Sequence, residues 1–324
     1  MIVTVTLNPC IDHLMFVEKL VLHDTNRVSN VVRNPGGKGV NLSRFAHSLG
    51  AETVATGLLG GGPGAYVRQV LSFEGVAHRF VEIADETRIN FCVDDCSGDP
   101  PTTFNEPGPN VTELELAQLY ELLGTTAKNA SWLAIGGSLP PHVPTSTVGE
   151  LIAIGKVCGA KTSLDADGEA LRVGLFAGPD FVKPNSREAE RLLGRSVRSI
   201  RDATEAVIEI EDILNRARGP GATKPYVTLS RGEAGAVLRY DGCTYYGESP
   251  RIAVQSTVGS GDSMIAAMLW SIEMGRTPED VLRWGIAAGT ATAACAGSSL
   301  GDLDATLALL NAVSVSRDVR QAVS

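Results

Sequence analysis

The sequence predicts an α/β protein: a doubly wound, mainly parallel sheet flanked by helices, with a small β-sheet lid. Three observations predict this fold. Short apolar, β-rich runs alternate with amphipathic helical runs along most of the 324 residues. Glycine or asparagine turns separate these runs, as is typical of βαβ units. Two stretches, 13–34 and 87–108, break the alternation because they contain strand-like runs and no convincing helix.

Each run of the alternating pattern is assigned by its composition and length. The expected strands are short and β-rich, and they lie at 2–7, 53–60, 131–137, 161–166, 179–185 and 225–230. The expected helices are amphipathic, and they lie at 39–50, 64–75, after 261 and after 277. Gly50 and Gly75 end the first two helices, since glycine favours the left-handed conformation found there. The stretch 285–302, rich in small residues, is predicted to be a helix packed closely on its neighbours.

The two exceptional stretches are expected to meet in space as a second, smaller sheet. In open α/β sheets, ligands bind outside the carboxyl ends of the parallel strands. A small sheet over those ends would act as a lid. The chain is therefore predicted to be a single domain, 1–324, with a lid from about 13–34 and 87–108.

Composition excludes several classes of protein. The 44% hydrophobic and 20% charged shares are ordinary for a soluble globular chain, and no apolar run reaches the roughly 18 residues of a membrane span. The net charge of −9 argues against broad nucleic-acid binding, although a local pocket can still be basic. Only Cys92 and Cys96 of the six cysteines are close, which is a poor zinc pattern. With no visible signal peptide, a reduced, cytoplasmic protein is expected.

Two motifs near the amino terminus carry polar groups after expected turns. The motif NPCID (8–12) ends in the carboxylate of Asp12, and an Asx turn explains it if it stands alone. The motif NPGGKGVNLSR (34–44) is not a Walker A loop, because Val32 and Gly39 stand where that loop requires glycine and serine or threonine. It remains a glycine-rich turn that leads a lysine and an asparagine into a helix.

Two further motifs follow later strands, and each has a structural alternative. In KPNSREAERLLG (183–194), Asn185 and Glu188 have the spacing of a capping box. They could also serve a hydrated magnesium ion, which needs few protein oxygens when phosphates supply the rest. In TLSRGEAGAVL (228–238), a hairpin turn and a backbone platform for a nucleotide phosphate are both open.

The motif GSGD (259–262) lies at the mouth of an apolar helix. Glycines allow a ligand to approach the backbone, and a helix start favours anions. Asp262 is either a simple N-cap or a base beside a bound phosphoryl group.

These five motifs, in this order, resemble the PfkB (ribokinase-like) family of sugar and nucleoside kinases across essentially the whole chain. The family signature D-T-x-G-A-G-D reads here as STVGSGD at 256–262, with serine in place of the first aspartate and of the alanine. That version looks like the phosphofructokinase and tagatose-phosphate kinase branch. So do VTLNPCID, TNRVSNVVRNPGGKGVNLSR, NEPGP and GGSLPP. The resemblance implies a ribokinase-like fold.

The resemblance also implies roles for individual residues. Asp262 corresponds to the catalytic base, and the anion hole for the transferred phosphoryl group corresponds to Gly259, Ser260 and Gly261. The sugar-binding positions correspond to Asp12, Gly37, Lys38, Asn41 and Ser138. The cations for the substrate's own phosphate would come from Arg27, Lys38 and Arg88, the two arginines reaching one pocket when the lid sheet assembles. The nucleotide would lie along Lys183, Asn185, Ser230 and Gly232, and magnesium would be served, through water, by Asn185 and Glu188.

The implied activity is an ATP- and Mg²⁺-dependent kinase acting on a phosphorylated ketohexose. The leading expectation is conversion of fructose 1-phosphate to fructose 1,6-bisphosphate, as in 1-phosphofructokinase. Tagatose-6-phosphate kinase and PfkB-type 6-phosphofructokinase remain open, because all three bind a ketohexose monophosphate with the same residue types. A non-catalytic sugar-phosphate sensor on this fold is the alternative from another class. The resemblance also implies a homodimer through the lid sheet, against a lid that folds only over its own active site.

Overall fold

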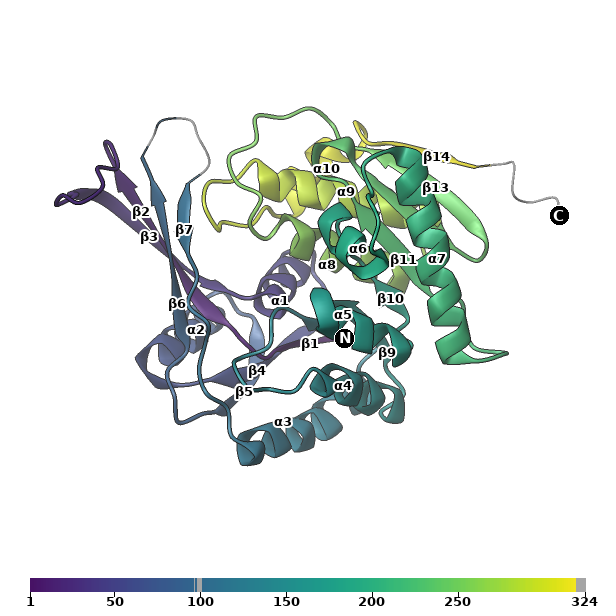
Figure 1. The fold of residues 1–324 in the computed structure, drawn as a ribbon, viewed down its shortest axis with the longest axis horizontal. Helices are drawn as coiled ribbons and strands as arrows, with labels where there is room; N and C mark the ends of the chain where they lie inside the picture. The colour runs from purple at the N-terminus through teal and green to yellow at the C-terminus, as the bar shows by residue number, and fades with distance from the viewer. Residues whose placement is uncertain (96, 98–100, 319–324) are drawn as a thin grey trace.

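The computed structural model describes residues 1–95, 97 and 101–318. Its main sheet has ten strands among these residues, in the order β14-β13-β12-β11-β10-β9-β8-β1-β4-β5 (Figure 1). The strands are β1 (Ile2–Thr6), β4 (Thr53–Leu59), β5 (Ala77–Glu82), β8 (Trp132–Gly136), β9 (Lys161–Asp165), β10 (Phe181–Val182), β11 (Tyr226–Ser230), β12 (Ala236–Tyr240), β13 (Cys243–Glu248) and β14 (Ser314–Arg317). The pairings from β5 to β11 are parallel, whereas β12, β13 and β14 are added antiparallel.

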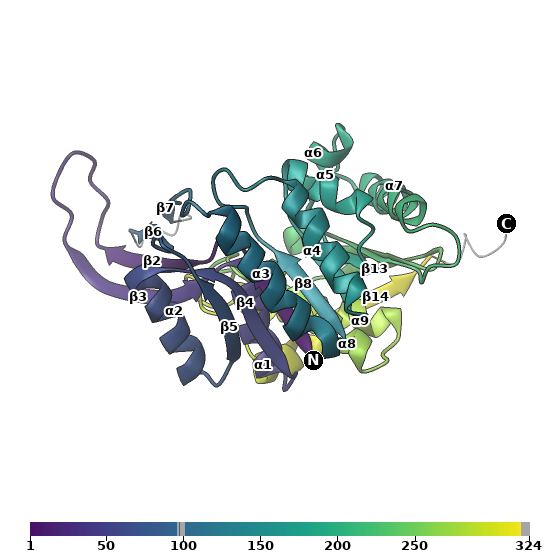
Figure 2. The same cartoon turned by 90° about the horizontal axis from the view of Figure 1, so that it is seen from below.

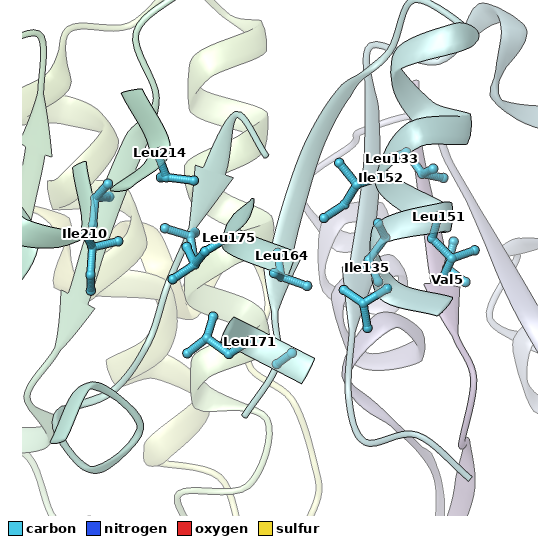
Figure 3. Packing of buried hydrophobic residues seen from close by; sticks show 14 of the residues in the cluster. Val5, Leu133, Ile135, Leu151, Ile152, Leu164, Leu171, Leu175, Ile210 and Leu214 are labelled. Atoms are coloured by element: carbon cyan, nitrogen blue, oxygen red, sulfur yellow. The ribbon is translucent and has the colours of Figure 1, made fainter. Parts of the chain in front are cut away.

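Helices cover both faces of this sheet. They are α1 (Lys38–Ser48), α2 (Gly61–Phe73), α3 (Glu113–Thr126), α4 (Ser146–Val157), α5 (Gly168–Phe176), α6 (Ser186–Leu193), α7 (Ile200–Arg218), α8 (Ser260–Glu273), α9 (Pro278–Ala293) and α10 (Leu303–Leu310). Alternate strand residues point to opposite faces. Val3 and Leu133 pack with α3, α4, α5 and α7, whereas Ile2 and Trp132 pack with α1, α8 and α9. Figure 3 shows part of the first group, with Leu133 on a strand and Leu151 and Leu171 on helices.

The small second sheet is present, and its order is β3-β2-β6-β7. Its strands are β2 (Cys10–Val17), β3 (Val28–Gly36), β6 (Arg88–Asp94) and β7 (Thr102–Phe104). Figure 2 shows it projecting from one end of the main sheet. The expected lid stretch 87–108 also contains 96 and 98–100, which lie outside the described residues together with Cys96.

Register gives the small sheet two chemically different faces. Asp12 pairs with Asn34 on β3 and with Asn90 on β6, so three polar side chains form one row. This row lies on the same face as Leu14, which packs against Gly297 of the main body. The opposite face carries His13, Met15, Val31, Phe91 and Phe104. The small sheet therefore has a polar inner face and a largely apolar outer face.

Several elements differ from the sequence prediction. The helix expected at 285–302 ends at Ala293, because the following segment turns at Gly297, whose φ is 61°. The strand expected at 179–185 is a continuous strand only over Phe181–Val182, and Asn185 adds one isolated bridge. Strands β5 and β14 are edge strands with many exposed side chains, and their weak apolar pattern did not reveal them. No helix among the described residues is long and apolar enough to cross a membrane.

We predict that Leu151→Ala lowers the free energy of unfolding by about 2–5 kcal/mol, since Leu151 is fully buried in the core under α4 and its loss leaves a cavity. Urea denaturation followed by circular dichroism measures the change. Val157→Ala on the same helix is the control, because Val157 is 89% exposed and its loss should cost within about 0.5 kcal/mol. Equal effects of the two substitutions would contradict this description of the core.

Candidate active site

The candidate site lies where the parallel strands of the main sheet end. The carboxyl ends of β1, β8, β9, β10 and β11 meet at one edge, since these strands are parallel. Polar residues close or follow these ends: Asn8, Ser138, Asp165, Lys183 and Ser230. Helices α1 and α8 begin at the same edge with glycines as their N-caps.

Asp262 is not the N-cap of α8. That position belongs to Gly259, which is left-handed at φ 77° and has no side-chain cap above it. The Asp262 carboxylate instead accepts a 2.8 Å hydrogen bond from Asn41 Nδ2 on α1. A Cβ on Gly259 would lie 2.6 Å from Leu300 Cδ2, and the positive φ is one that other residues rarely adopt, so this position favours glycine. Ser260 N donates to Thr257 O at 3.4 Å, so the start of α8 offers the N–H groups of Gly259 and Gly261 to an anion, with a carboxylate held beside them.

A charge cluster, buried except for the partly exposed Lys38, lies beside Asp262. Lys38 Nζ is 3.1 Å from Asp165 Oδ1 and 3.7 Å from Glu188 Oε1. Lys183 is 3% exposed, and its Nζ is 4.0 Å from the same Asp165 oxygen. Burial opposes the charge of Asp165, but Lys183 and Lys38 outweigh it and hold its pKa below the ordinary value. Burial also opposes the charge of Lys38, and the surrounding carboxylates still raise its pKa.

The pKa of Asp262 is shifted in the opposite direction to that of Asp165. Burial, and then the negative charge of Asp165, raise the pKa of Asp262 to about 6, against the partial opposition of Lys38, Asn41 and Lys183. Asp262 is therefore mostly ionised at neutral pH and is a stronger proton acceptor than a free aspartate. A carboxylate in this state can deprotonate a hydroxyl group that is placed next to it.

Asn185 and Glu188 form the capping box that begins α6. Asn185 Oδ1 accepts from the Glu188 N–H at 3.0 Å, and Glu188 Oε2 accepts from the Asn185 N–H at 2.8 Å. Glu188 Oε1 takes no part in the cap and faces Lys38. Among the described residues there is no group of three or more metal-binding side chains. These donors suit a hydrated magnesium ion whose other ligands are phosphates, and they do not suit a cage made by the protein alone.

On the lid side, Asp12 is held by two neighbours. Asn90 Nδ2 donates to Asp12 Oδ1 at 3.0 Å, and the Cys10 thiol donates to the same oxygen at 3.3 Å. A Cβ on Gly36 would lie 2.5 Å from Asp12 Oδ2, so the carboxylate lies directly on the glycine backbone. Gly37 follows in a positive-φ conformation, at φ 109°, and caps α1. The arrangement fixes a carboxylate where hydroxyl groups of a ligand could donate to it.

Asn8 ties the base of the lid to the main sheet. Its Nδ2 donates to Pro107 O at 2.9 Å and to Ser138 Oγ at 3.2 Å. The backbone carbonyl oxygen of Asn8 accepts from Arg88 Nη2 at 3.1 Å, and Arg88 Nη1 donates to the backbone oxygen of Glu106 at 3.0 Å. Ser138 is exposed at the end of β8. Arg88 therefore stands at the inner end of the lid, already engaged by two carbonyl oxygens.

Arg27 and Arg88 are not brought together within one chain, contrary to the sequence prediction. Register pairs Cys10 with Arg88 and Val17 with Val28, so the two arginines flank opposite ends of β2. Seven residues of strand separate them by about 23 Å. Arg27 is exposed at the outer tip, where β3 begins. Sequence reasoning could not foresee this, because the motif containing an arginine does not give the strand register.

On the nucleotide side, Ser230 lies beside Asn185 through a parallel backbone bridge. Ser230 N donates to Pro184 O at 3.1 Å. Gly232 is exposed and begins a 3₁₀ turn, Gly232–Ala234, between the antiparallel strands β11 and β12. The hairpin expected from the sequence is thus present, and its turn lies next to the start of α6.

Asp165, Asn90 and Asn8 were not identified from the sequence as members of the site. Asp165 ends the strand β9, and its position at the carboxyl end of a parallel strand was the available signal. Asn90 lies two residues after Arg88, on the same side of its strand, within the stretch TRINF. Asn8 is the first residue of the motif NPCID, in which only Asp12 was predicted as a site residue.

The fold and the site together define an enzyme class. A helix start for an anion, a buried carboxylate beside it, lysines, and oxygen donors for a hydrated metal are the parts that phosphoryl transfer to a hydroxyl group needs. The protein is a kinase with a ribokinase-like fold. More particularly, the chain belongs to the pfkB family of carbohydrate kinases, whose family model matches residues 5–305.

Individual relatives agree with this assignment. A 1-phosphofructokinase from Haloferax volcanii is 34% identical over 308 residues, which cover 95% of each chain. Phosphofructokinase-2 from Escherichia coli, in complex with substrates and products, is 32% identical with a TM-score of 0.88, over 96% of this chain and 98% of that one. The same enzyme has a tetrameric inhibited form, 30% identical with a TM-score of 0.85 over the same shares. Arabidopsis thaliana ribokinase, 21% identical with a TM-score of 0.74 over 95% of this chain and 98% of that one, shares the fold.

We predict that Asp262→Asn stabilises the protein at pH 8 by roughly 3 kcal/mol, at 1.36 kcal/mol for each pKa unit between 3.8 and about 6. The folded protein binds the Asp262 proton more tightly than the unfolded chain, so ionising this group above pH 6 destabilises the fold. The amide still accepts from Asn41. Denaturation at several pH values measures the gain, which should shrink as the pH falls from 6 towards 4. A gain that stays constant with pH would contradict the raised pKa.

Proposed function

We propose that this protein is an ATP- and Mg²⁺-dependent sugar-phosphate kinase, and that it acts as a 1-phosphofructokinase. The observation that carries the proposal is the buried Asp262 carboxylate, held by Asn41 beside the uncapped start of α8. The relative from Haloferax volcanii, at 34% identity over 95% of both chains, supports fructose 1-phosphate as the acceptor. The five cysteines among the described residues carry free thiols, which supports a cytoplasmic setting for the proposal.

In the proposed reaction, Asp262 takes the proton from the 6-hydroxyl group of fructose 1-phosphate as that oxygen attacks the γ-phosphorus of ATP in line. The bond between this phosphorus and the leaving oxygen of ADP breaks in the same step, without a phosphoenzyme. The N–H groups of Gly259, Ser260 and Gly261 would donate hydrogen bonds to the negatively charged oxygens of the transferred phosphoryl group. Glu188 and Asn185 would hold a hydrated magnesium ion through its water ligands, and the ion would supply charge neutralisation for the phosphates.

The sugar would lie between the lid and α1. Asp12 would accept from its hydroxyl groups, with Gly37, Asn41 and Ser138 around it. Arg88 would bind the substrate's own phosphate at the inner end of the lid, since a guanidinium suits phosphate recognition. Its present carbonyl partners hold it in place there. Lys38 is paired with Asp165, which supports a role between the two substrates rather than at the lid.

Tagatose-6-phosphate kinase and 6-phosphofructokinase activity are the alternative outcomes. The E. coli phosphofructokinase-2 relative, at 32% identity, is nearly as similar to this chain as the 1-phosphofructokinase. All three substrates are ketohexose monophosphates, so the same carboxylate and arginine would serve each of them. The position of the phosphate relative to Arg88 would separate fructose 1-phosphate from the two 6-phosphates, which differ from each other only in the configuration at C4.

We predict that fructose 1-phosphate gives the highest kcat/KM with Mg-ATP, ahead of fructose 6-phosphate, tagatose 6-phosphate and free fructose. Initial rates of ADP formation measure this order. Asp262→Asn should lower kcat by about 10²–10⁴-fold, the usual contribution of a general base, while both substrates still bind. Asp304→Asn is the control, because Asp304 also lies in the first turn of a helix, α10.

Each outcome of this assay has a definite meaning. A different winning ketohexose phosphate would keep the kinase and reassign its substrate. Turnover of free fructose alone would remove the phosphate-binding role from Arg88. Full activity of Asp262→Asn would show that Asp262 is not the base. Binding of sugar phosphate without any turnover would favour a sugar-phosphate sensor.

We further propose a homodimer that pairs the outer faces of two lid sheets. On this face Phe104 is 59% and Val31 42% exposed, beside Met15, Phe91 and Val93. Exposed apolar sheet faces of this kind mark interaction surfaces. The same face on a second copy is a self-complementary partner, as two-fold symmetry requires. The E. coli relative forms a tetramer, which shows that an enzyme of similar fold self-associates.

We predict a solution mass of two 34.0 kDa chains by sedimentation equilibrium. Phe104→Asp should shift it towards one chain, because a buried charge at the pairing face is costly. Phe176→Asp is the matched control, since Phe176 is 64% exposed on α5 and should leave the mass unchanged. A monomeric wild-type protein would refute the dimer, and a dimer that survives Phe104→Asp would require another face.

A further inference from the structure

The inner face of the lid rests on the segment 294–302, which follows α9 and which we call the bridging segment. Asn34 Nδ2 on β3 donates to Ser298 Oγ at 3.1 Å, between positions 264 residues apart. Leu14 on β2 is 4% exposed and packs against Gly297, where a Cβ would collide with the leucine side chain. Ser298 is itself 6% exposed. The lid is thus docked on this segment by one hydrogen bond and one apolar contact.

The other end of the bridging segment reaches the start of α8. Leu300 packs over Gly259, as the 2.6 Å approach of a Cβ built on this glycine shows. Gly301 N donates to Thr292 Oγ1 at 3.1 Å, and Thr292 Oγ1 donates to Ser263 Oγ at 2.7 Å. Thr292 and Ser263 are fully buried, and Ser263 N donates to Gly259 O at 2.9 Å. The bridging segment therefore buttresses the first turn of α8, directly beside Asp262.

We propose that Asn34 and Ser298 are positioning residues that make the geometry around Asp262 depend on the position of the lid. This inference rests on the proposed kinase activity. Neither residue touches the reacting atoms; each acts through the bridging segment. This segment contacts the lid at Gly297 and Ser298, the N-cap of α8 at Leu300, and Thr292 of α9 at Gly301. A lid that is docked on Ser298 holds Leu300 against the N-cap Gly259 and Gly301 against Thr292, which bonds to Ser263 of α8. A lid that is undocked leaves that turn without its support.

The chemistry gives such a link a purpose. A site that can place a phosphoryl group on a sugar hydroxyl can also place it on water. Asp12, which would hold the sugar, is in register with Asn34 on the neighbouring strand. A sugar bound at Asp12 therefore favours the same lid position that lets Asn34 reach Ser298. The start of α8 is then fully supported when the acceptor is present, and transfer to water is disfavoured at other times.

The test compares Asn34→Ala, Ser298→Ala and the double variant in the full-length protein. Each single variant should raise KM for the sugar phosphate about five-fold, which is the change expected from the loss of one neutral hydrogen bond. Each should lower kcat as well. The double variant should be no worse than either single one, because both remove the same bond. ADP formed per phosphorylated sugar formed should rise above one in all three variants. A merely structural role would not change this ratio.

Two matched controls lie next to the substituted residues. Ser29→Ala removes a hydrogen bond to Phe16 O within the same β2–β3 hairpin. Ser299→Ala changes the serine that follows Ser298 in the bridging segment. Both should leave KM, kcat and the product ratio unchanged. Single variants that behave like these controls, or single effects that multiply in the double variant, would overturn the proposal while the kinase activity stands.

If the wild-type protein phosphorylates none of the sugars, the proposed function fails and the link is tested without turnover. Hydrogen–deuterium exchange of the ligand-free protein should then be about five-fold faster for β2 and β3 in Asn34→Ala and Ser298→Ala than in wild type. Equal exchange in these proteins would overturn the link.

Discussion

The hydrogen bond from Asn41 to Asp262 joins the first turns of α1 and α8, and the site depends on the carboxylate that it holds. Burying a carboxylate is costly unless polar groups and opposite charges surround it. Here Lys38 and Lys183 lie beneath it, and Asp165 pairs with both lysines. The lysines favour the ionised form of Asp262, while its burial, and then the negative charge of Asp165, raise its pKa. The main sheet supplies this balance because β9 and β10 end side by side.

Glycines control how closely the backbone approaches the site. At Gly36 the carboxylate of Asp12 lies on the main chain, and at Gly259 a leucine from the bridging segment occupies the space of a side chain. The two positions belong to different motifs that are more than two hundred residues apart. Both allow a close contact at the start of a helix. Gly36 lets the lid approach the start of α1, and Gly259 lets the bridging segment approach the start of α8. At Gly297 and Gly259, the side chains of Leu14 and Leu300 therefore lie directly on glycine backbone.

Much of this arrangement was predictable from the sequence. The alternating period gives the strands and helices of the main sheet, and the two irregular stretches give the small one. The motifs identify Asp262, Asn41 and Asp12, because their neighbours restrict them to strand ends and helix starts. Asp165 was not predicted as a site residue, because a single aspartate at the end of a strand has no local sequence signature. The separation of Arg27 from Arg88, and the end of α9 at Ala293, depend on register and on tertiary contacts, which local patterns do not contain.

The pairing of the small sheet has a consequence for how the protein is made. Strands β2 and β3 are neighbours in the chain and can form a hairpin early. Strand β6 must pair parallel with β2 across a separation such as the 78 residues between Asp12 and Asn90. Such distant pairing forms slowly during folding. A chain leaving the ribosome therefore carries a β2–β3 hairpin with an open edge until β6 is synthesised and the intervening β4, α2 and β5 have been placed. This interval is when a nascent chain is most exposed to aggregation and to capture by chaperones.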